Sequence, residues 1–498
     1  MAQKSIAIIG AGIAGLSAGC YARMNGFDVD IYESHDGPGG MCTAWKRKDF
    51  IFDYCIHNLG GTSTKSGLHN VWRELGALED RGVINHDEFV TIEVPEGETV
   101  HWYANLDRLG RHLKSISPED AETIDEMIDA ARRLAKADLF SMGLGGTARM
   151  LRALPHLSLL KRWSQVSIGQ YAARLNSPVL QRALRHMMYD VPGDEMPMIP
   201  VLMFTGGLGA GDLGWPIGGS LAFSEAVEKR FIDLGGRLHY KSKVERILVR
   251  HGRAVGILLA DGVDRRADYI VSAADGYSTL YGMLDGKYLT EPIRHYYDSV
   301  GDVGPFGLIV YLGLKGTRAD APHALTLVFD EPLDVGGIEQ ESVHVVYVGP
   351  DTGLAPAGKS VLKIEVQAKY SYWKERRDAD LKAYRDEKNR VADRIISRLE
   401  QRLPELREQI EVTDVCTPLT AERYTGNRFG WQAGPATENV EEVQRRGLSR
   451  TLPGLKGFYH VGQWADASLG VSTVAISGRN MVKHVCKTEG RKFTTIQR

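Results

Sequence analysis

Residues 33–61 carry several side chains that could do chemistry. Two thiols, Cys42 and Cys55, and one imidazole, His57, lie close together in the sequence. Such groups can bind a metal ion, act as nucleophiles or transfer a proton. A metal ion needs three or four converging ligands, and Cys42, Cys55 and His57 provide at most three. We therefore predict no metal site and retain His57 as the candidate catalytic residue.

The composition is that of an ordinary globular protein. The chain has 498 residues, 43% of them hydrophobic, and a net charge of −2, so it has room for two or three domains and no charge excess that would favour nucleic acid. The cysteines are five in number and form no C-x-x-C pair, which favours a reducing, cytoplasmic location. No apolar run is long enough to predict a transmembrane helix.

The N-terminal segment has the pattern of a dinucleotide site. An apolar run at 5–10 predicts a buried strand, and "GAGIAG" follows with Gly10, Gly12 and Gly15 before a helical stretch. Glycines at this spacing allow a tight turn, a close backbone approach to a pyrophosphate and close packing of helix on strand. Glu33, at the end of a second predicted strand, could accept hydrogen bonds from ribose hydroxyls, which favours FAD or NAD over NADP.

A second glycine pair distinguishes between these two cofactors. Gly39 and Gly40 follow Glu33 closely, and NAD does not require such a pair, whereas a long extended cofactor such as FAD would use it. With Phe52-Asp53 at the end of the next predicted strand, this segment resembles the N-terminal signature of FAD-dependent amine oxidases and carotenoid desaturases. The resemblance implies FAD as the cofactor.

The C-terminal segment at 452–485 resembles the closing motif of phytoene desaturase-like proteins, a strand, a glycine-containing loop and a final helix that begins near Val471. The resemblance implies contacts to the ribityl and phosphate groups at Gly462 and Gln463, and contacts to the flavin ring at Gly470, Val471 and Ser472. Ala467-Ser468-Leu469 replaces a glycine-rich run of that family. The cofactor-binding residues implied in total are Gly10, Gly12, Ala14, Gly15, Glu33, Ser34, Gly39, Gly40, Met41, Gly60, Val244, Gly462, Gln463, Gly470, Val471 and Ser472.

Two further segments in the middle of the chain contain glycines. Residues 218–262 predict a helix followed by short strands, which alone is typical of a β-meander; the family resemblance implies that Val244 packs on the adenine. "FTGGLGAGDLG" at 204–214 has the wrong spacing for a second nucleotide site, so we expect a structural glycine loop there.

The resemblance also implies the domain organisation. We expect an α/β FAD-binding Rossmann-like domain of the glutathione-reductase type, discontinuous over residues 1–105, 201–275 and 426–498. Residues 106–200 and 276–425 would form an α+β substrate-binding or cap domain. The charged run that ends the latter region predicts a helix that covers a sheet.

The segment 148–175 mixes leucine, tryptophan and basic residues at helical spacing. It predicts either a peripheral membrane surface that admits lipid substrates or a helical lid packed on the core.

The same resemblance narrows the activity. It implies an FAD-dependent oxidoreductase of the phytoene desaturase, carotenoid isomerase and retinol saturase group, acting on C–C bonds of an apolar isoprenoid or polyene. "FDYCIHNLGG" is similar to the saturase-like pattern, with Cys55 in place of a glycine. His57 could donate a proton or bind a substrate oxygen, or could instead be held by backbone hydrogen bonds. Tyr424 and Arg428 are further candidates for lining the substrate tunnel. The sequence identifies no electron partner.

Two alternatives remain open. A flavin amine oxidase would need an aromatic cage and a lysine near the flavin N5, and Phe458, Tyr459 and Trp464 are aromatic residues in the relevant region. A prenyl-protein escort of the GDP-dissociation-inhibitor type would share the fold without binding flavin.

Overall fold

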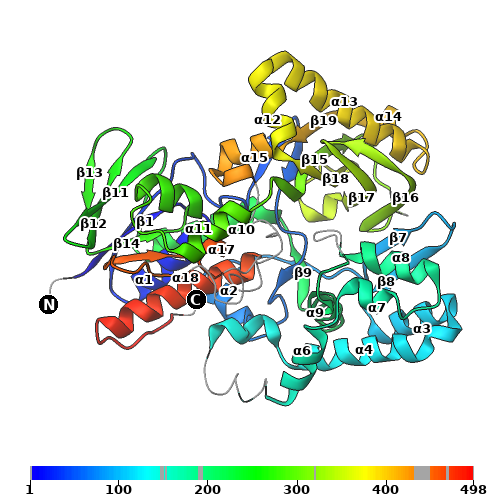
Figure 1. Cartoon of the computed structure of the whole chain (residues 1–498), viewed down its shortest axis with the longest axis horizontal. Coiled ribbons are helices and arrows are strands. Elements are labelled where there is room, and N and C mark those ends of the chain that lie inside the picture. The colour runs from blue at the N-terminus through cyan, green and yellow to red at the C-terminus, as the bar shows by residue number, and fades with distance from the viewer. Residues whose placement is uncertain are drawn as a thin grey trace.

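Figure 1 shows the computed structural model, with a parallel sheet and its helices on the left and a second sheet and a group of helices on the right. The structure describes residues 3–145, 151, 154–188, 194–318, 321–430, 449–466 and 470–496.

A parallel five-stranded sheet forms the core of the left-hand part. Its strands are, in spatial order, β10 (Arg237–His239), β2 (Asp28–Tyr32), β1 (Ser5–Ile9), β14 (Tyr269–Ser272) and β20 (Phe458–His460). Helices α1 (Ile13–Met24), α10 (Gly219–Asp233) and α18 (Val471–Thr488) pack on one face, against Ile6 and Ile8. The antiparallel strands β11 (Val244–Arg250), β12 (Arg253–Leu259) and β13 (Asp264–Arg266) form a sheet that packs on the other face, against Ala7 and Ile9. Both faces of β1 are therefore buried, which explains its uninterrupted apolar run.

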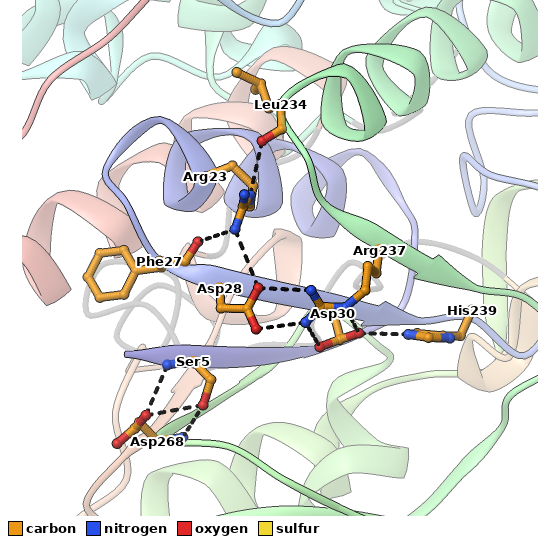
Figure 2. A network of polar contacts seen from close by, with 9 residues as sticks. All are labelled: Ser5, Arg23, Phe27, Asp28, Asp30, Leu234, Arg237, His239 and Asp268. Atoms are coloured by element: carbon orange, nitrogen blue, oxygen red, sulfur yellow. Dashed lines mark hydrogen bonds and ion pairs between the residues drawn. The ribbon is translucent and has the colours of Figure 1, made fainter. Parts of the chain in front are cut away.

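A network of ion pairs fastens β10 to the edge of this sheet (Figure 2). The Arg237 guanidinium donates to Asp28 and Asp30 of β2 at 2.7–2.9 Å, and His239 lies 2.7 Å from Asp30. Arg23 at the end of α1 donates to the Phe27 carbonyl at 2.7 Å and so fixes the turn into β2. The Arg237–Asp28 contacts lie toward the start of β2, away from Gly10 and Glu33. His239 pairs with Tyr32, and its carbonyl accepts from the Glu33 N–H at 2.8 Å, so the network also holds the strand end that carries Glu33.

The second sheet confirms the predicted α+β region. Its seven strands are, in order, β19 (Ile410–Cys416), β15 (Val303–Leu314), β18 (Ser360–Lys369), β17 (Ile338–Val348), β16 (Ala324–Val335), β7 (Glu88–Glu93) and β8 (Thr99–Tyr103). Helices α12 (Tyr370–Ala379) and α13 (Leu381–Glu400) cover it, and Val391, Ile395 and Leu399 pack against the strands. Because β7 and β8 belong to this sheet, it includes strands from both sides of the predicted boundary near residue 105. The division into two domains stays a prediction.

The region between β8 and β9 (Leu213–Pro216) is helical. It comprises α3 (Leu106–Ile116), α4 (Ala121–Lys136), α6 (Leu157–Trp163), α7 (Ile168–Ala172), α8 (Pro178–Met187) and α9 (Met198–Gly209). The prediction of a glycine loop at 204–214 is wrong for the first half of that segment, which belongs to α9. A Cβ at Gly206 would lie 2.4 Å from the Ala131 carbonyl oxygen, so the glycine allows α9 to pack closely on α4.

Shorter elements connect these layers. They are β3 (Ala44–Arg47), β4 (Phe50–Asp53), β5 (Leu59–Gly60), α2 (His69–Glu74), β6 (Val83–Ile84), β9 (Leu213–Pro216), α11 (Glu291–Ser299), α14 (Leu406–Gln409), α15 (Pro418–Thr425) and α17 (Gln463–Asp466). Within the described part of the chain, no helix is both long and apolar enough to cross a membrane.

Candidate functional site

The glycine turn between β1 and α1 has the geometry that the sequence predicts. Gly10 has a positive φ of 96°, a conformation that residues with a side chain rarely adopt. A Cβ at Gly15 would lie 2.0 Å from the Gly10 carbonyl oxygen, so any larger residue would push α1 away from the strand. Gly12 is the N-cap of α1, and among the described residues no side chain caps it. The N-terminal N–H groups of α1 and its positive dipole end are therefore available to an anion.

Glu33 lies directly after β2 and reaches this turn. Its carboxylate accepts hydrogen bonds from the Ala11 N–H at 2.7 Å and from the His35 N–H at 2.8 Å, and the Ser34 hydroxyl donates to it at 3.2 Å. The Glu33 carbonyl accepts from the Ser242 N–H at 2.7 Å, two residues before the buried Val244. The acid and Val244 thus lie at the same end of the sheet as the glycine turn.

Gly39 and Gly40 form a second turn beside the first. The Gly39 N–H donates to the Ala11 carbonyl at 2.9 Å, and both glycines have positive φ values of 106° and 61°. A Cβ at Gly40 would lie 3.4 Å from the Cα of Gly12, so the two glycine turns approach each other backbone to backbone. Met41 follows, with its sulfur 2.9 Å from the Asn427 amide nitrogen.

The C-terminal motif meets the N-terminal one. A Cβ at Gly462 would lie 3.2 Å from the Cβ of Ala14, and α18 packs so closely on α1 that a Cβ at Gly478 would lie 2.5 Å from the Ala14 carbonyl oxygen. Gln463 begins α17, and Gly470 is the N-cap of α18 with a φ of 102°. The expected course of the loop at 467–469 lies outside the described residues.

The start of α18 also contacts the segment that follows His57. The Ser472 hydroxyl, one residue after Val471, donates to the carbonyl of Gly60 at 3.2 Å. Contacts thus link the two glycine turns, Glu33, Gly462 and the Ser472–Gly60 pair, although the cofactor roles of these residues stay predictions. The chain supplies these residues from both of its ends.

Asp53 anchors the segment that carries His57. Its buried carboxylate accepts from the backbone N–H of Ser220 at 2.5 Å and from the Ser220 hydroxyl at 2.6 Å, and so caps the N-terminus of α10. A Cβ at Gly219 would lie 2.2 Å from the Asp53 carboxylate. The Ser220 hydroxyl also accepts from the N–H of Ile56 at 2.8 Å, next to His57. Burial raises the pKa of the Asp53 carboxyl, and the Ser220 hydrogen bonds oppose that shift.

His57 lies in a buried polar cluster. Its Nε2 is 2.5 Å from Nζ of Lys363, a residue of β18, and 3.5 Å from Oε1 of Glu365. Lys363 and Glu365 pair at 2.8 Å, and their side chains are only 2% and 3% exposed. Burial, followed by the Lys363 charge, holds the pKa of His57 well below its usual value, so the imidazole is neutral at pH 7.

Aromatic rings surround this cluster. The fully buried Trp215 of β9 lies 6.2 Å from the His57 ring and 5.3 Å from the His323 ring, centroid to centroid. His323 stacks on His86 at 3.4 Å. Burial also lowers the pKa values of His86 and His323, the former to about 4. His57 thus contacts the charged pair Lys363–Glu365 and lies among aromatic rings.

Cys42 does not contribute a reactive group. Cys42 is buried, its thiol lies 3.5 Å from the Ser220 carbonyl, and burial raises its pKa well above the usual range. The thiol therefore stays protonated and is a poor nucleophile. Among the described residues, no three histidine, cysteine or acidic side chains form a group that could hold a metal ion.

The other predicted candidates lie apart from His57. Tyr424 is 47% exposed, with its ring 5.6 Å from that of His35. The Arg428 guanidinium lies 4.0 Å from the Tyr277 ring, and its backbone N–H donates to Asp275 at 3.2 Å. The aromatic residues suggested for an amine-oxidase cage, Phe458, Tyr459 and Trp464, are all buried.

Sequence reasoning missed Lys363 and Glu365. Their segment, "SVLKIEVQ", is mostly apolar and has the pattern of a buried strand, but its two opposite charges are two residues apart and therefore lie on the same face of a strand. An apolar run of this kind predicts a buried strand. Charged residues within it indicate that their side chains are paired with other polar groups inside the protein, because burying an unpaired charge is very costly in free energy.

Comparison with known proteins confirms the resemblance. Residues 8–75 match the family model for an NAD(P)-binding Rossmann-like domain. The chain is 25% identical over 490 residues to prolycopene isomerase of Daucus carota, covering 95% of this chain and 78% of that protein. It is 26% identical over 500 residues to the zeta-carotene-forming phytoene desaturase of Myxococcus xanthus, covering 96% and 92% of the two chains. It is 24% identical over 468 residues to all-trans-retinol 13,14-reductase of Danio rerio, covering 84% and 75%.

Solved structures show the same fold. An oxidoreductase from Methanosarcina mazei superposes with a TM-score of 0.61 at 17% identity and covers 96% of this chain and 100% of its own. Cyclohexylamine oxidase from Brevibacterium oxydans gives a TM-score of 0.61 at 14% identity, with coverage of 98% and 100%. The predicted fold class is therefore confirmed.

Proposed function

We propose that this member of the amine-oxidase-type flavoprotein superfamily is an FAD-dependent oxidoreductase that acts on C–C bonds of an apolar polyene or isoprenoid. The observation that carries the proposal is the full-length similarity to a prolycopene isomerase and a phytoene desaturase, together with the joined glycine turns at Gly12 and Gly40. Desaturation, saturation and isomerisation of the polyene are all compatible with this similarity.

The glycine turns fit an extended dinucleotide. The heavy atom nearest to a Cβ built at Gly12 would be the Gly39 carbonyl oxygen at 3.8 Å, so a side chain would fill space that this chain leaves open at the N-terminus of α1. The α1 N-terminus would hold the pyrophosphate, and Glu33 would hold the ribose hydroxyls. The N-terminus of α18, at Gly470 to Ser472, would stabilise negative charge on the ring. The second glycine turn favours FAD over NAD.

FAD would supply hydride transfer at its ring. The chain's own contribution would be to exclude water, to orient the polyene and to offer His57 as a neutral hydrogen-bond donor. Because burial keeps the His57 imidazole neutral, its N–H would donate a hydrogen bond to the substrate or flavin and would not transfer a proton.

Photoreduction of the FAD-loaded protein without oxygen, followed by a screen of polyenes, enones and amines, tests the proposal. We expect a polyene or enone to change the flavin oxidation state or to be isomerised. In His57→Gln we expect kcat/KM to fall by about 100-fold or more, since loss of one positioned hydrogen-bond donor costs this much, with unchanged flavin content. The control His251→Gln alters an exposed histidine and should be neutral. Turnover of amines alone would contradict the proposed substrate class.

One observation favours the second candidate, amine oxidation. Lys363 is a buried lysine beside His57, and a flavin amine oxidase would need a lysine near the flavin. However, the Lys363 ammonium already donates to the Tyr54 carbonyl at 2.9 Å and pairs with Glu365 at 2.8 Å. The amine arm of the same screen decides between the two candidates.

We also propose that the protein contacts a membrane surface where it collects its apolar substrate. Leu157 of α6 and Leu154 of the turn before it are 49% and 55% exposed, and the neighbouring Lys161 is also exposed, whereas Leu159 and Trp163 of α6 are buried. One side of this segment thus packs on the core and the other presents leucines to solvent, an arrangement typical of peripheral membrane contact.

Sedimentation with phosphatidylcholine–phosphatidylserine vesicles measures this contact. We expect the double variant Leu154→Asp/Leu157→Asp to bind vesicles at least about 10-fold more weakly, because burying two leucines in the interface contributes several kcal/mol. Leu381→Asp is the matched control, since Leu381 is 46% exposed but lies on α13. Equal binding by wild type and the double variant would exclude a role for these leucines.

A further inference from the structure

Lys363 has a contact pattern that bears on the protonation of His57. A lysine ammonium has three N–H donors and no acceptor. In this structure it faces three acceptors: the Tyr54 carbonyl oxygen at 2.9 Å, Oε1 of Glu365 at 2.8 Å and Nε2 of His57 at 2.5 Å. The Lys363 side chain is only 2% exposed, so water does not hydrate its ammonium group. The three acceptors together offset the free-energy cost of burying this charge.

The third contact fixes the imidazole tautomer. A neutral imidazole carries its proton on one ring nitrogen, and the other nitrogen can only accept. Because the Lys363 ammonium can only donate, Nε2 of His57 must be the acceptor, and the proton must be on Nδ1. The alternative tautomer would set an N–H group against an ammonium at 2.5 Å.

We propose that Lys363 is a positioning residue, held by Glu365 and the Tyr54 carbonyl, that keeps His57 in the Nδ1–H tautomer. This inference deepens the proposed function, because it specifies which nitrogen of His57 could serve as the donor. It also links the two parts of the molecule, since Lys363 belongs to β18 of the seven-stranded sheet and His57 to the segment between β4 and β5.

The charges around His57 make the effect of removing Lys363 predictable. Glu365 lies 3.5 Å from Nε2 and would become its nearest charged group, since His323 and His344 are kept neutral by burial. In Lys363→Met the carboxylate would favour a proton on Nε2, so the tautomer should switch. The pKa of His57 should also rise, because Lys363 lowers it in the wild type.

Long-range ¹H–¹⁵N NMR of protein labelled with ¹⁵N-histidine tests this inference without flavin or substrate. The His57 signals are assigned by their absence in His57→Gln. In the wild type we expect a protonated Nδ1 and an unprotonated Nε2 between about pH 6 and pH 8. This pH range is chosen because it avoids acid unfolding of the protein. We expect Nε2 to become protonated in Lys363→Met, and a mixture of tautomers in the charge-neutral variant Lys363→Met/Glu365→Gln.

Lys359→Met is the control, since Lys359 precedes the same strand but pairs with Glu411 at 2.7 Å. It should leave the His57 signals unchanged. A protonated Nε2 in the wild type would overturn the proposal even if the Lys363 variants did not fold, and an unchanged His57 pattern in folded Lys363→Met would also overturn it. Failure of the polyene screen would not affect either outcome, because the NMR measurement reports the tautomer alone.

Discussion

Gly15→Ala should abolish stable FAD binding, with a loss of affinity of at least about 100-fold, equivalent to about 2.7 kcal/mol. The added Cβ would lie 2.0 Å from the Gly10 carbonyl oxygen and 3.2 Å from the Cβ of Ala273. Because the first of these is a backbone atom, the clash can be relieved only by moving α1 away from β1. That movement would displace the α1 N-terminus, which we expect to hold the pyrophosphate.

Equilibrium dialysis of apoprotein with FAD measures the effect, with the unfolding temperature recorded beside it. Gly37→Ala is the matched control: it makes the same chemical change in the loop before Gly39, where a Cβ would have no neighbour within 4 Å in the described structure. Equal FAD affinity for wild type and Gly15→Ala would contradict the assignment of this turn to the cofactor.

The second large effect should be a steep loss of stability below pH 6.5. Burial holds the pKa values of His57, His323 and His344 well below the usual range, so all three are neutral in the folded protein. Above about pH 6.5 they are neutral in the unfolded chain as well, and their contribution is fully present. As the pH falls, only the unfolded chain binds these protons, and the free energy of unfolding should decrease by up to about 4 kcal/mol per pH unit for the three together.

Buried carboxyls reduce this slope. Burial raises the pKa of Asp212 to about 6 and also raises that of Asp53, so these groups take up protons in the folded state as the pH falls. Urea unfolding between about pH 7.5 and 5 measures the net effect. His344→Gln should lower the proton uptake on unfolding by about one, whereas His251→Gln, at an exposed position, should have no effect. A stability that does not change over this range would contradict the neutral, buried state of the cluster.

Local chemistry explains why the backbone geometry of the proposed cofactor site could be predicted from the sequence. The turn at Gly10 to Gly15 and the acid at Glu33 lie on consecutive elements. Gly10 and Gly15 meet steric requirements of the backbone around them, and Gly12 leaves space open at the N-terminus of α1. Alternate residues of β1 pack on opposite layers, which the apolar run predicted. The resemblance supplied the C-terminal half of the site, because nothing local indicates that Gly462 contacts Ala14.

The failures concern contacts between distant segments. The glycines at 206–209 suggested a loop, but they lie in α9 because their lack of a side chain lets that helix pack closely on its neighbours. Lys363 and His57 are separated by 306 positions, and only the packing of β18 against the segment after β4 brings them together. A charged pair within an apolar strand indicates that the pair contacts a further polar residue in the interior, but the sequence does not identify that residue.

The absorption spectrum of the purified protein, before and after incubation with FAD and gel filtration, tests the central claim most directly. The account predicts flavin bands that co-elute with the protein at close to one FAD per chain and that disappear in Gly15→Ala. A folded wild-type protein that neither carries nor takes up FAD would contradict the account and would favour the non-catalytic escort that shares this fold.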